Sequence, residues 1–424
     1  MKIDIIPKPK YIRAKSTEIM VKYAAEIYGE ENNFQEIIAA FKNYLYNLHG
    51  IELKDGRNGI CLHKESFTER EAYRIECNAT QIDVYVNTVE GLRNAFSTLL
   101  QLIEKKGTGI GIPCVDIVDR PSNKIRWFML ELSARYHSVE LICHYIDLCV
   151  FFKLNGIHLH FTDNMGYTLP SKSYPKLTTK ERFYTCDEIA YIVNYAKIRG
   201  IDIIPELDLP AHTKPFADAY GEIFGEFQDN LRASEVVFQS LKTLIQELVE
   251  LFPNSKYIHI GGDEVKTQYW LNDQDTLEYM KEMKIDNLSD LYCHYIGRLA
   301  QIVLDMGRIP VIWEGFPRSG NSYIPRESLI IAWECYYQMP DELLADGFKI
   351  ISSSVKPLYI VHKHWGAEFT LSWRLNEWYN WFKESKAYPE GGYIIAESEN
   401  NLGGLMCAWG LLFEKDEREA IKEE

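Results

Sequence analysis

The sequence lacks long apolar runs: no stretch approaches the roughly 18 residues of a membrane-spanning helix, and Leu148–Phe152 is typical of the longest. The first ten residues, MKIDIIPKPK, lack the apolar segment and cleavage site of a secretory signal. The nine cysteines contain no C-x-x-C pair, so neither a disulfide framework nor a zinc cluster is predicted. We therefore expect a reduced, cytoplasmic protein that makes no contact with a membrane.

Basic residues are also in short supply. The 46 lysines and arginines face 61 aspartates and glutamates, a formal net charge of −15, so the basic surface that nucleic acid requires is not predicted. Among 424 residues, 46% are hydrophobic and 25% charged, which excludes disorder and predicts a large core, with more than one domain. The 9 tryptophans and 27 tyrosines fit either a buried core or a site that stacks on sugar rings.

Residues 1–120 predict a small α+β domain without a catalytic cluster. Apolar residues that return at three and four predict helices at Glu18–Ile27, Asn33–Leu48 and Gly91–Lys105. Alternation on both sides of a short turn predicts a hairpin of Tyr73–Cys77 and Gln81–Val86.

Residues 121–424 show a different sequence pattern, in which short apolar runs alternate with stretches of helical periodicity. Such βα repeats predict an α/β fold with a parallel sheet, and eight of them predict a closed (β/α)8 TIM barrel. Because only fifteen residues follow Trp409, either the last helix is abbreviated or a second copy of the chain covers that side as a homodimer. The eight predicted strands are Trp127–Leu132, Gly156–Phe161, Ile201–Leu207, Tyr257–Ile260, Pro310–Trp313, Leu329–Trp333, Phe348–Ser352 and Gly404–Trp409.

Polar and aromatic residues gather on these strands and at their ends. Since a barrel builds its active site at the carboxyl ends of its strands, we expect many of these side chains to converge. Carboxylates, histidines and tryptophans together are typical of sugar chemistry. The residues are Arg126, Glu131, His158, His160, Asp163, Asn164, Glu206, Asp208, His212, Asp263, Glu264, Trp313, Glu314, Trp333, Glu334 and Trp409.

The most informative motif for the chemistry is HIGGDE, His259–Glu264. Its two glycines allow a close approach of backbone or substrate, and neighbouring side chains on an extended segment point in different directions. Asp263 and Glu264 could therefore contact different atoms of one sugar. The alternative is that both carboxylates only cap the start of a helix, and the motif alone leaves the two interpretations open.

Three motifs in the same order resemble glycoside hydrolase family 20, the β-N-acetylhexosaminidases. They are KLNGIHLHFTDNMGYTLPSKSYPKLT (Lys153–Thr178), DIIPELDLPAHT (Asp202–Thr213) and HIGGDE, and FMLELSARYHSVE (Phe128–Glu140) resembles the first barrel strand of the family. The resemblance covers residues 126–409, and the N-terminal unit resembles the small α+β domain that precedes the barrel. It implies an exo-acting glycosidase that removes terminal β-linked GlcNAc or GalNAc from an oligosaccharide or glycoconjugate, without a cofactor.

The resemblance also implies a substrate-assisted mechanism, in which the acetamido oxygen of the sugar attacks the anomeric carbon and forms an oxazolinium ion with retention of configuration. Glu264 would be the general acid and base. Asp263 would hold the acetamido N–H and stabilise its positive charge. Asp163 and His212 would support the acid and tune its proton affinity.

Five further residues match binding positions of the family. Trp313, Trp333 and Trp409 would enclose the acetamido group and the ring, and the Tyr359 hydroxyl would orient the acetamido oxygen. Arg126 would clamp the hydroxyls O3 and O4. Plain alternatives stay open, because the aromatic residues could be barrel core and the arginine could form an ion pair with a strand glutamate, Glu131.

A metal site is conceivable from residue type alone, but the implied reaction needs no metal and none is predicted. The residues in question are His158, His160, Asp163 and His212.

The chain departs from the family at Val361 and Leu411, where an aspartate and a glutamate often contact sugar hydroxyls. Loss of these partners predicts relaxed selection between GlcNAc and GalNAc, with other contacts from the tryptophan-rich stretch 364–381. Other functions stay open: a lacto-N-biosidase-like enzyme that releases disaccharides, a sugar-binding protein without turnover, and a barrel glycosidase with Glu314 as its nucleophile.

Overall fold

The computed structural model describes residues 3–22, 26–28, 34–50, 52, 54–55, 59–106, 109–180, 182–360, 377–378 and 393–410. The chain forms two compact units. One comprises residues 1–124, 143–155 and 194–201, and the other comprises residues 125–142, 156–193 and 202–424. Among the described helices, none is both long and apolar enough to cross a bilayer.

The N-terminal part of the first unit is a mixed sheet with two helices, α1 (Gln35–His49) and α2 (Val89–Leu102). The strand order is β1-β8-β5-β6-β4-β2-β3, and β7 pairs with β8. Phe41 of α1 stacks on Phe96 of α2 with ring centroids 4.1 Å apart, within a buried apolar cluster. The strands are β1 (Tyr11–Lys22), β2 (Glu26–Tyr28), β3 (Lys54–Asp55), β4 (Gly59–Lys64), β5 (Tyr73–Cys77), β6 (Ile82–Val86), β7 (Glu104–Lys106) and β8 (Gly109–Asp119).

The structure confirms most elements predicted here and corrects one. The helices over α1 and α2 are present, and β5 pairs with β6 as an antiparallel hairpin. The helix predicted at Glu18–Ile27 is wrong, because residues 18–22 belong to β1, which pairs antiparallel with β8. A short apolar run fits either period, and here pairing with a long neighbouring strand decides in favour of the sheet.

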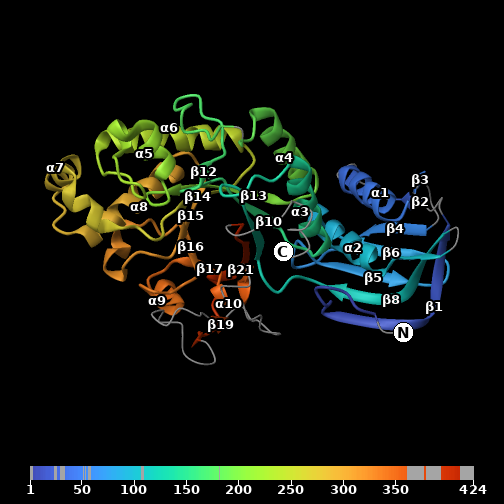
Figure 1. Ribbon diagram of the computed structural model, residues 1–424. Coiled ribbons are helices and arrows are strands. Elements are labelled where there is room, and N and C mark those ends of the chain that lie inside the picture. The colour runs from blue at the N-terminus through green and yellow to red at the C-terminus, as the bar shows by residue number, and fades with distance from the viewer. Residues whose placement is uncertain are drawn as a thin grey trace. The chain divides into compact units, whose positions relative to one another are not determined.

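The second unit contains a closed parallel barrel, and the predicted eight-stranded fold is confirmed. Strands follow in the order β9-β10-β13-β14-β15-β16-β17-β21, and β21 pairs with both β17 and β9 to close the ring (Figure 1). A short strand, β18 (Tyr359–Ile360), adds to β21. The barrel strands are β9 (Ile125–Glu131), β10 (Gly156–His160), β13 (Asp202–Leu209), β14 (Tyr257–Gly261), β15 (Ile309–Trp313), β16 (Leu329–Ala332), β17 (Lys349–Ser352) and β21 (Asn401–Ala408).

Helices and short hairpins connect the strands. Side chains of Ser234 and Asn287 cap the starts of the two longest helices by accepting backbone N–H groups. The connecting elements are α3 (Val139–Phe151), β11 (Thr162–Asp163), β12 (Gly166–Tyr167), α4 (Cys186–Ile198), α5 (Lys214–Phe224), α6 (Glu235–Leu251), η2 (Thr267–Asn272), α7 (Gln274–Met283), α8 (Leu288–Asp305), η3 (Arg318–Tyr323), α9 (Pro340–Ala345), α10 (Val355–Leu358), β19 (Glu377–Trp378) and β20 (Tyr393–Ile394).

Side chains alternate between the barrel interior and its outer face. On β9, Trp127 and Met129 belong to the buried cluster around Trp313, and Met129 pairs in register with His158 of β10. Because neighbouring residues in parallel register point to the same side, His158 and His160 also point inward. The barrel interior is therefore partly polar. Val361, Leu411, most of stretch 364–381 and the predicted last helix lie outside the described residues.

Candidate active site

The segment Gly261-Gly262-Asp263-Glu264 leaves β14 in an unusual backbone conformation. Gly261 and Gly262 have φ angles of 71° and 115°, and Glu264 has φ 51°, all in the left-handed region. Glycine adopts this region freely, whereas a glutamate there costs free energy and is often held at functional sites. The next helical element is η2, whose capping position is Lys266, so the alternative that Asp263 and Glu264 merely cap a helix is wrong.

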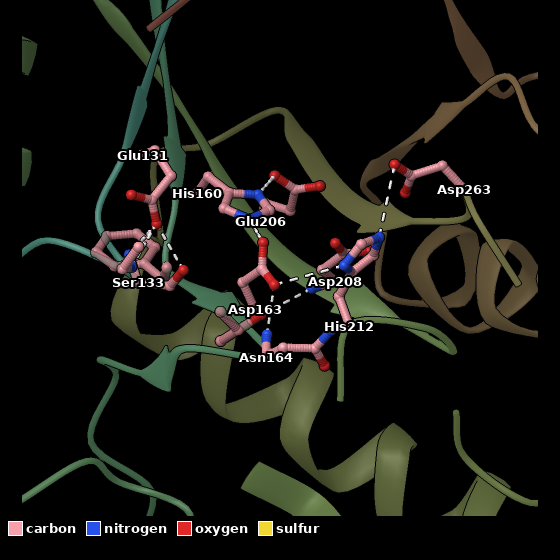
Figure 2. A network of polar contacts seen from close by, with 12 residues as sticks. Glu131, Ser133, His160, Asp163, Asn164, Glu206, Asp208, His212 and Asp263 are labelled. Atoms are coloured by element: carbon pink, nitrogen blue, oxygen red, sulfur yellow. Dashed lines mark hydrogen bonds and ion pairs between the residues drawn. The ribbon is translucent and has the colours of Figure 1, made fainter. Parts of the chain in front are cut away.

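His212 lies at the centre of the predicted acid group. Its Nε2 atom is 3.4 Å from Oε2 of Glu264. The same atom is 4.0 Å from Oδ2 of Asp263, and its Nδ1 atom is 3.4 Å from Oδ1 of Asp163 (Figure 2). Burial disfavours the charged ring, but the nearby Asp208 carboxyl and the bonds to Asp163 and Glu264 outweigh it and raise the pKa of His212 well above its usual value. His212 is therefore an imidazolium that joins three carboxylates.

The two adjacent carboxyls have opposite environments. The Glu264 side chain is 57% exposed, and its hydrogen bond with His212 lowers its pKa. The Asp263 side chain is 13% exposed, and burial, helped by the charge of Glu264, raises its pKa to about 7 against the opposing charge of His212. Oδ1 of Asp263 has no hydrogen-bond partner among the described residues. A buried acceptor and an exposed carboxylate thus stand side by side.

In the barrel interior, Glu206 contacts several polar side chains. It is fully buried and contacts Nε2 of His158 at 2.8 Å, Nδ1 of His259 at 3.0 Å and Nδ1 of His160, and it accepts the indole N–H of Trp313 at 2.8 Å. Burial would raise the pKa of Glu206, but the three histidines hold it well below its usual value. A single buried negative charge therefore organises the floor of the site.

The histidines around Glu206 differ in charge. Burial lowers the pKa of His158 to about 4, so this ring is neutral. Burial also opposes charge on His160, but the carboxylates of Glu206 and Asp163 together raise its pKa well above its usual value. His160 reaches Asp163 through Nε2 at 3.4 Å. Partial burial opposes the charge of Asp163, but bonds with His160 and His212 outweigh it, lower its pKa and keep it ionised.

Asp208 is a site residue that the sequence placed at a strand end without assigning it a role. It is 2% exposed, and its carboxylate lies within 4.8 Å of donor atoms of His212 and Asp263. Burial and the charge of Asp263 raise its pKa well above its usual value, so it is a neutral carboxyl. The sequence does hold a signal for this role, because Asp208 stands two residues after Glu206 in PELDLP. Side chains two residues apart on a strand point to the same face, so the two carboxyls are predicted to lie on one side of the strand.

The four predicted aromatic residues come together beside the acid group. Trp333 stacks on Tyr359 at 6.1 Å and 3°, and Tyr359 lies 5.9 Å from Trp409. Trp313 is 6.3 Å from both Trp333 and Trp409. At 1% exposure and bonded to Glu206, Trp313 has the surroundings of a core residue. Trp333 and Tyr359 are 8% and 7% exposed and Trp409 is half-buried, so these three form a largely covered aromatic wall.

The structure does not bring Arg126 to this group. It is the second residue of β9, at the end away from Glu131, and alternation places it on the face opposite Trp127. Glu131 instead accepts the backbone N–H groups of Ser133 and Ala134, both at 2.6 Å. A hydroxyl clamp at Arg126 stays a prediction that its position does not support.

Glu314 binds the backbone of the loop that follows β16. It is 1% exposed, and its Oε1 accepts the backbone N–H groups of Tyr337 and Gln338, each at 3.1 Å. Burial raises its pKa to about 7. A buried, loop-binding carboxyl is poorly placed to attack a sugar, which weighs against Glu314 as a nucleophile.

Two sets of side chains in the described part of the chain have donor atoms close enough for a metal ion, His158-His160-Glu206 and Asp208-His212-Asp263. In the first set, hydrogen bonds from both rings to one carboxylate oxygen already account for the arrangement. In the second set, the imidazolium supplies the positive charge between two carboxyls. Hydrogen bonding and charge pairing therefore explain both clusters.

Comparison with known proteins identifies the family models that match the chain. The model of the glycosyl hydrolase family 20 catalytic domain matches residues 124–420, and the model of domain 2 of that family matches residues 2–120. The chain is 26% identical over 367 residues to a beta-hexosaminidase of Vibrio furnissii, covering 78% of this chain and 60% of the relative. It is 25% identical over 354 residues to beta-hexosaminidase subunit A2 of Dictyostelium discoideum, covering 80% and 64%. The chain thus spans less than two thirds of either relative.

Among solved structures, the fold is similar to that of a family 20 exo-β-N-acetylglucosaminidase from Vibrio harveyi in complex with N-acetylglucosamine. The TM-score is 0.81 at 20% identity, and the match covers 98% of this chain and 71% of that one.

Proposed function

The chain belongs to glycosyl hydrolase family 20, and from this membership we propose that it is an exo-acting β-N-acetylhexosaminidase that releases terminal β-linked GlcNAc or GalNAc with retention of configuration. The observation that carries the proposal is the contrast between Asp263, whose buried Oδ1 has no partner among the described residues, and Glu264, which is exposed and bonded to His212. The names of the two relatives and the sugar bound to the V. harveyi enzyme support it.

In the proposed reaction, the substrate supplies its own nucleophile. The acetamido carbonyl oxygen bonds to the anomeric carbon while the bond to the leaving oxygen breaks, and Glu264 donates its proton to that oxygen. Water then attacks the oxazolinium ion, and Glu264 accepts the proton of the water. Asp263 accepts the acetamido N–H through Oδ1, which has no hydrogen-bond partner within the described part of the chain, and its negative charge stabilises the cation.

The role of acid requires Glu264 to be protonated when the sugar is bound. In the free site its carboxylate is ionised beside the imidazolium of His212. A bound sugar removes water from the exposed side chain, and desolvation raises the pKa of a carboxyl. Substrate binding would therefore move the proton affinity of Glu264 toward the value that an acid needs.

The aromatic wall suits one terminal ring. Trp333 and Tyr359 are 8% and 7% exposed, so together with Trp409 they offer a narrow, largely covered surface. The Tyr359 hydroxyl would bind the acetamido oxygen and aim it at the anomeric carbon. A site that holds one ring this closely favours release of single sugars from chain ends over cleavage within a chain.

The test compares the nitrophenyl β-glycosides of GlcNAc, GalNAc and glucose, with wild type, Glu264→Gln and Glu250→Gln. Glu250 is an exposed carboxylate on α6 and serves as the matched control. We expect hydrolysis of the two acetamido sugars only, reduced by about 10²–10⁴ in Glu264→Gln and unchanged in Glu250→Gln. Cleavage of the glucoside would contradict substrate assistance, and silence on all three would favour a disaccharide-releasing or sugar-binding relative.

A further inference from the structure

We propose that Asp229 and Asn230, in the loop between α5 and α6, are positioning residues for the general acid Glu264. The inference rests on the proposed hexosaminidase function and adds to its acid group two residues that act on the acid. Both are buried, at 8% and 1% exposure, although aspartate and asparagine are mostly surface residues. Buried polar side chains are held by hydrogen bonds, so their partners show what this pair stabilises.

Asn230 binds the backbone two residues after Glu264. Its Nδ2 atom donates to the carbonyl of Lys266 at 3.1 Å, and its Oδ1 atom accepts the backbone N–H of Lys266 at 3.2 Å. One side-chain amide thus binds both backbone polar groups of a single residue. Because Glu264 has φ 51°, this pair of hydrogen bonds holds the end of a strained turn.

The position of Glu264 depends on where its backbone is held. Its side chain is 57% exposed and its contact with His212 is long, at 3.4 Å, so side-chain contacts constrain it weakly. A general acid must lie within hydrogen-bond reach of the leaving oxygen, and a misplacement of about 1 Å can cost about a hundredfold in rate. A clamp on the turn that carries Glu264 therefore acts on catalysis.

Asp229 connects the same turn to Asp163. Its Oδ2 atom binds the ammonium group of Lys266, and its Oδ1 atom accepts the side-chain amide of Asn164 at 2.6 Å. Asn164 in turn donates its backbone N–H to Asp163, beside which it lies in Figure 2. One carboxylate thus links the segment after the acid to the aspartate that contacts His212.

The backbone of the same segment is joined to the chain before His212. Asn230 and Ala211 form an antiparallel β-bridge, and the N–H of Leu231 donates to the carbonyl of Pro210 at 2.8 Å. The segment therefore binds the chain beside each of three members of the acid group, which follow β10, β13 and β14. A displacement of this one segment would move all three.

The charge of Asp229 also favours a proton on Glu264. The bond with His212 lowers the pKa of Glu264, whereas burial and the negative charge of Asp229 act in the opposite direction. An acid must be protonated before it can act, so Asp229 contributes to the same step as the clamp. Asp229→Asn, which removes the charge and hardly changes the volume, should therefore weaken protonation of the leaving oxygen.

The test uses the dependence of rate on the leaving group, which separates acid catalysis from general damage to the fold. We would measure kcat/KM on N,N′-diacetylchitobiose, whose leaving sugar needs a proton, and on the 2,4-dinitrophenyl β-glycoside of GlcNAc, whose leaving group departs without one. We expect Asn230→Ala to lose about 10- to 100-fold on the disaccharide and under about threefold on the dinitrophenyl glycoside. Asp229→Asn should show the same pattern to a smaller extent.

Asn155→Ala is the matched control, because Asn155 also binds backbone, the carbonyl of Lys124 at 2.8 Å, but stands before the amino end of β10. Its loss should change the two rates by the same factor. Hydrogen exchange followed by mass spectrometry gives a readout without turnover: exchange in peptides that contain Lys266 should be faster in Asn230→Ala and unchanged in Asn155→Ala.

Equal losses on both substrates in Asn230→Ala, or unchanged exchange at Lys266, would overturn the clamp. If Asn230→Ala does not fold, Asp229→Asn decides by its ratio of the two rates. Failure of the proposed function would look different, because wild type would then hydrolyse neither substrate, whereas hydrogen exchange still reports whether Asn230 holds the turn.

Discussion

Oδ1 of Asp208 lies 1.8 Å from the position that a Cβ atom would take at Gly261. The neutral carboxyl of β13 therefore fills the space that the missing side chain leaves on β14. With φ at 71°, Gly261 is also in a region that other residues enter only at a cost. The close contact sets how near Asp208 stands to the Asp263 loop.

Gly261→Ala is expected to abolish activity, because the new methyl group must displace either Asp208 or the backbone that leads to Asp263. The matched control is Gly307→Ala, where φ is also 71° but no atom lies within 4 Å of a Cβ. The control shares the conformational cost, about 1–2 kcal/mol, without the collision. Steady-state rates and urea denaturation of both variants separate the two effects, and equal activity losses would contradict this account.

The pH dependence of kcat/KM should reflect one proton shared by Asp263 and Glu264. The productive form has Glu264 protonated and Asp263 ionised, but in the free enzyme the pKa of about 7 at Asp263 and the lowered pKa of Glu264 place that proton mainly on Asp263. We expect kcat/KM to fall above about pH 7, when the pair loses its last proton, and to fall at acid pH, when both carboxyls are protonated.

The assignment is checked with Asp263→Asn, using an activated nitrophenyl glycoside to keep its residual rate measurable. In this variant the alkaline limb belongs to Glu264 alone and should move to lower pH. An alkaline limb that stays near pH 7 in the variant, or wild-type activity that is flat beyond pH 8.5, would contradict the shared proton.

Asp263→Asn should also stabilise the ligand-free protein above neutral pH. The folded-state pKa of Asp263, about 7, lies above its ordinary value of 3.8, so the unfolded chain loses this proton first and stability falls as pH rises between the two values. The amide avoids that cost, which is on the order of 2–4 kcal/mol at full ionisation. Thermal unfolding at pH 4 and pH 8 should show a gain at pH 8 only; a loss at pH 8 would contradict the prediction.

Glu206→Gln should destabilise the fold far more than loss of a surface ion pair does. The substitution removes the buried charge that His160 faces, and breaking a buried pair typically costs about 3–5 kcal/mol. Glu235→Gln is the control, since Glu235 is 58% exposed and pairs with Arg298 at 2.8 Å, an interaction worth under about 1 kcal/mol. Urea midpoints that differ little between the two variants would indicate that the charge of Glu206 is dispensable.

The barrel was predictable from sequence because parallel strands covered on both faces are continuous apolar runs. All eight predicted runs coincide with barrel strands, and Trp333, Tyr359 and Trp409 lie together as the motifs implied. The helix predicted at Glu18–Ile27 is wrong because a distant part of the chain decides the structure of residues 18–22. That segment becomes a strand by pairing with β8, a partner distant in the chain, and no local period reports such a pairing.

The polar floor of the site was not predictable in the same way. His158, His160 and His259 meet at Glu206 only because β10, β13 and β14 adopt one particular register, in which these positions stand side by side. The neutral state of Asp208 likewise depends on burial and on the charge of Asp263, which belong to the assembled barrel. Residue types suggested sugar chemistry, whereas the charge of each group follows from packing.

Closure of the barrel by β21 has a consequence for biosynthesis. β9 and β17 each lack one pairing partner until β21 has been made. At about 5–20 residues per second, the ribosome makes β21 tens of seconds after β9. During that interval, unpaired strand edges and the incomplete barrel interior lie open, which is the state in which nascent chains aggregate or recruit chaperones. Trp409 follows directly on β21, so the aromatic wall is completed only after β21 has been made and has paired.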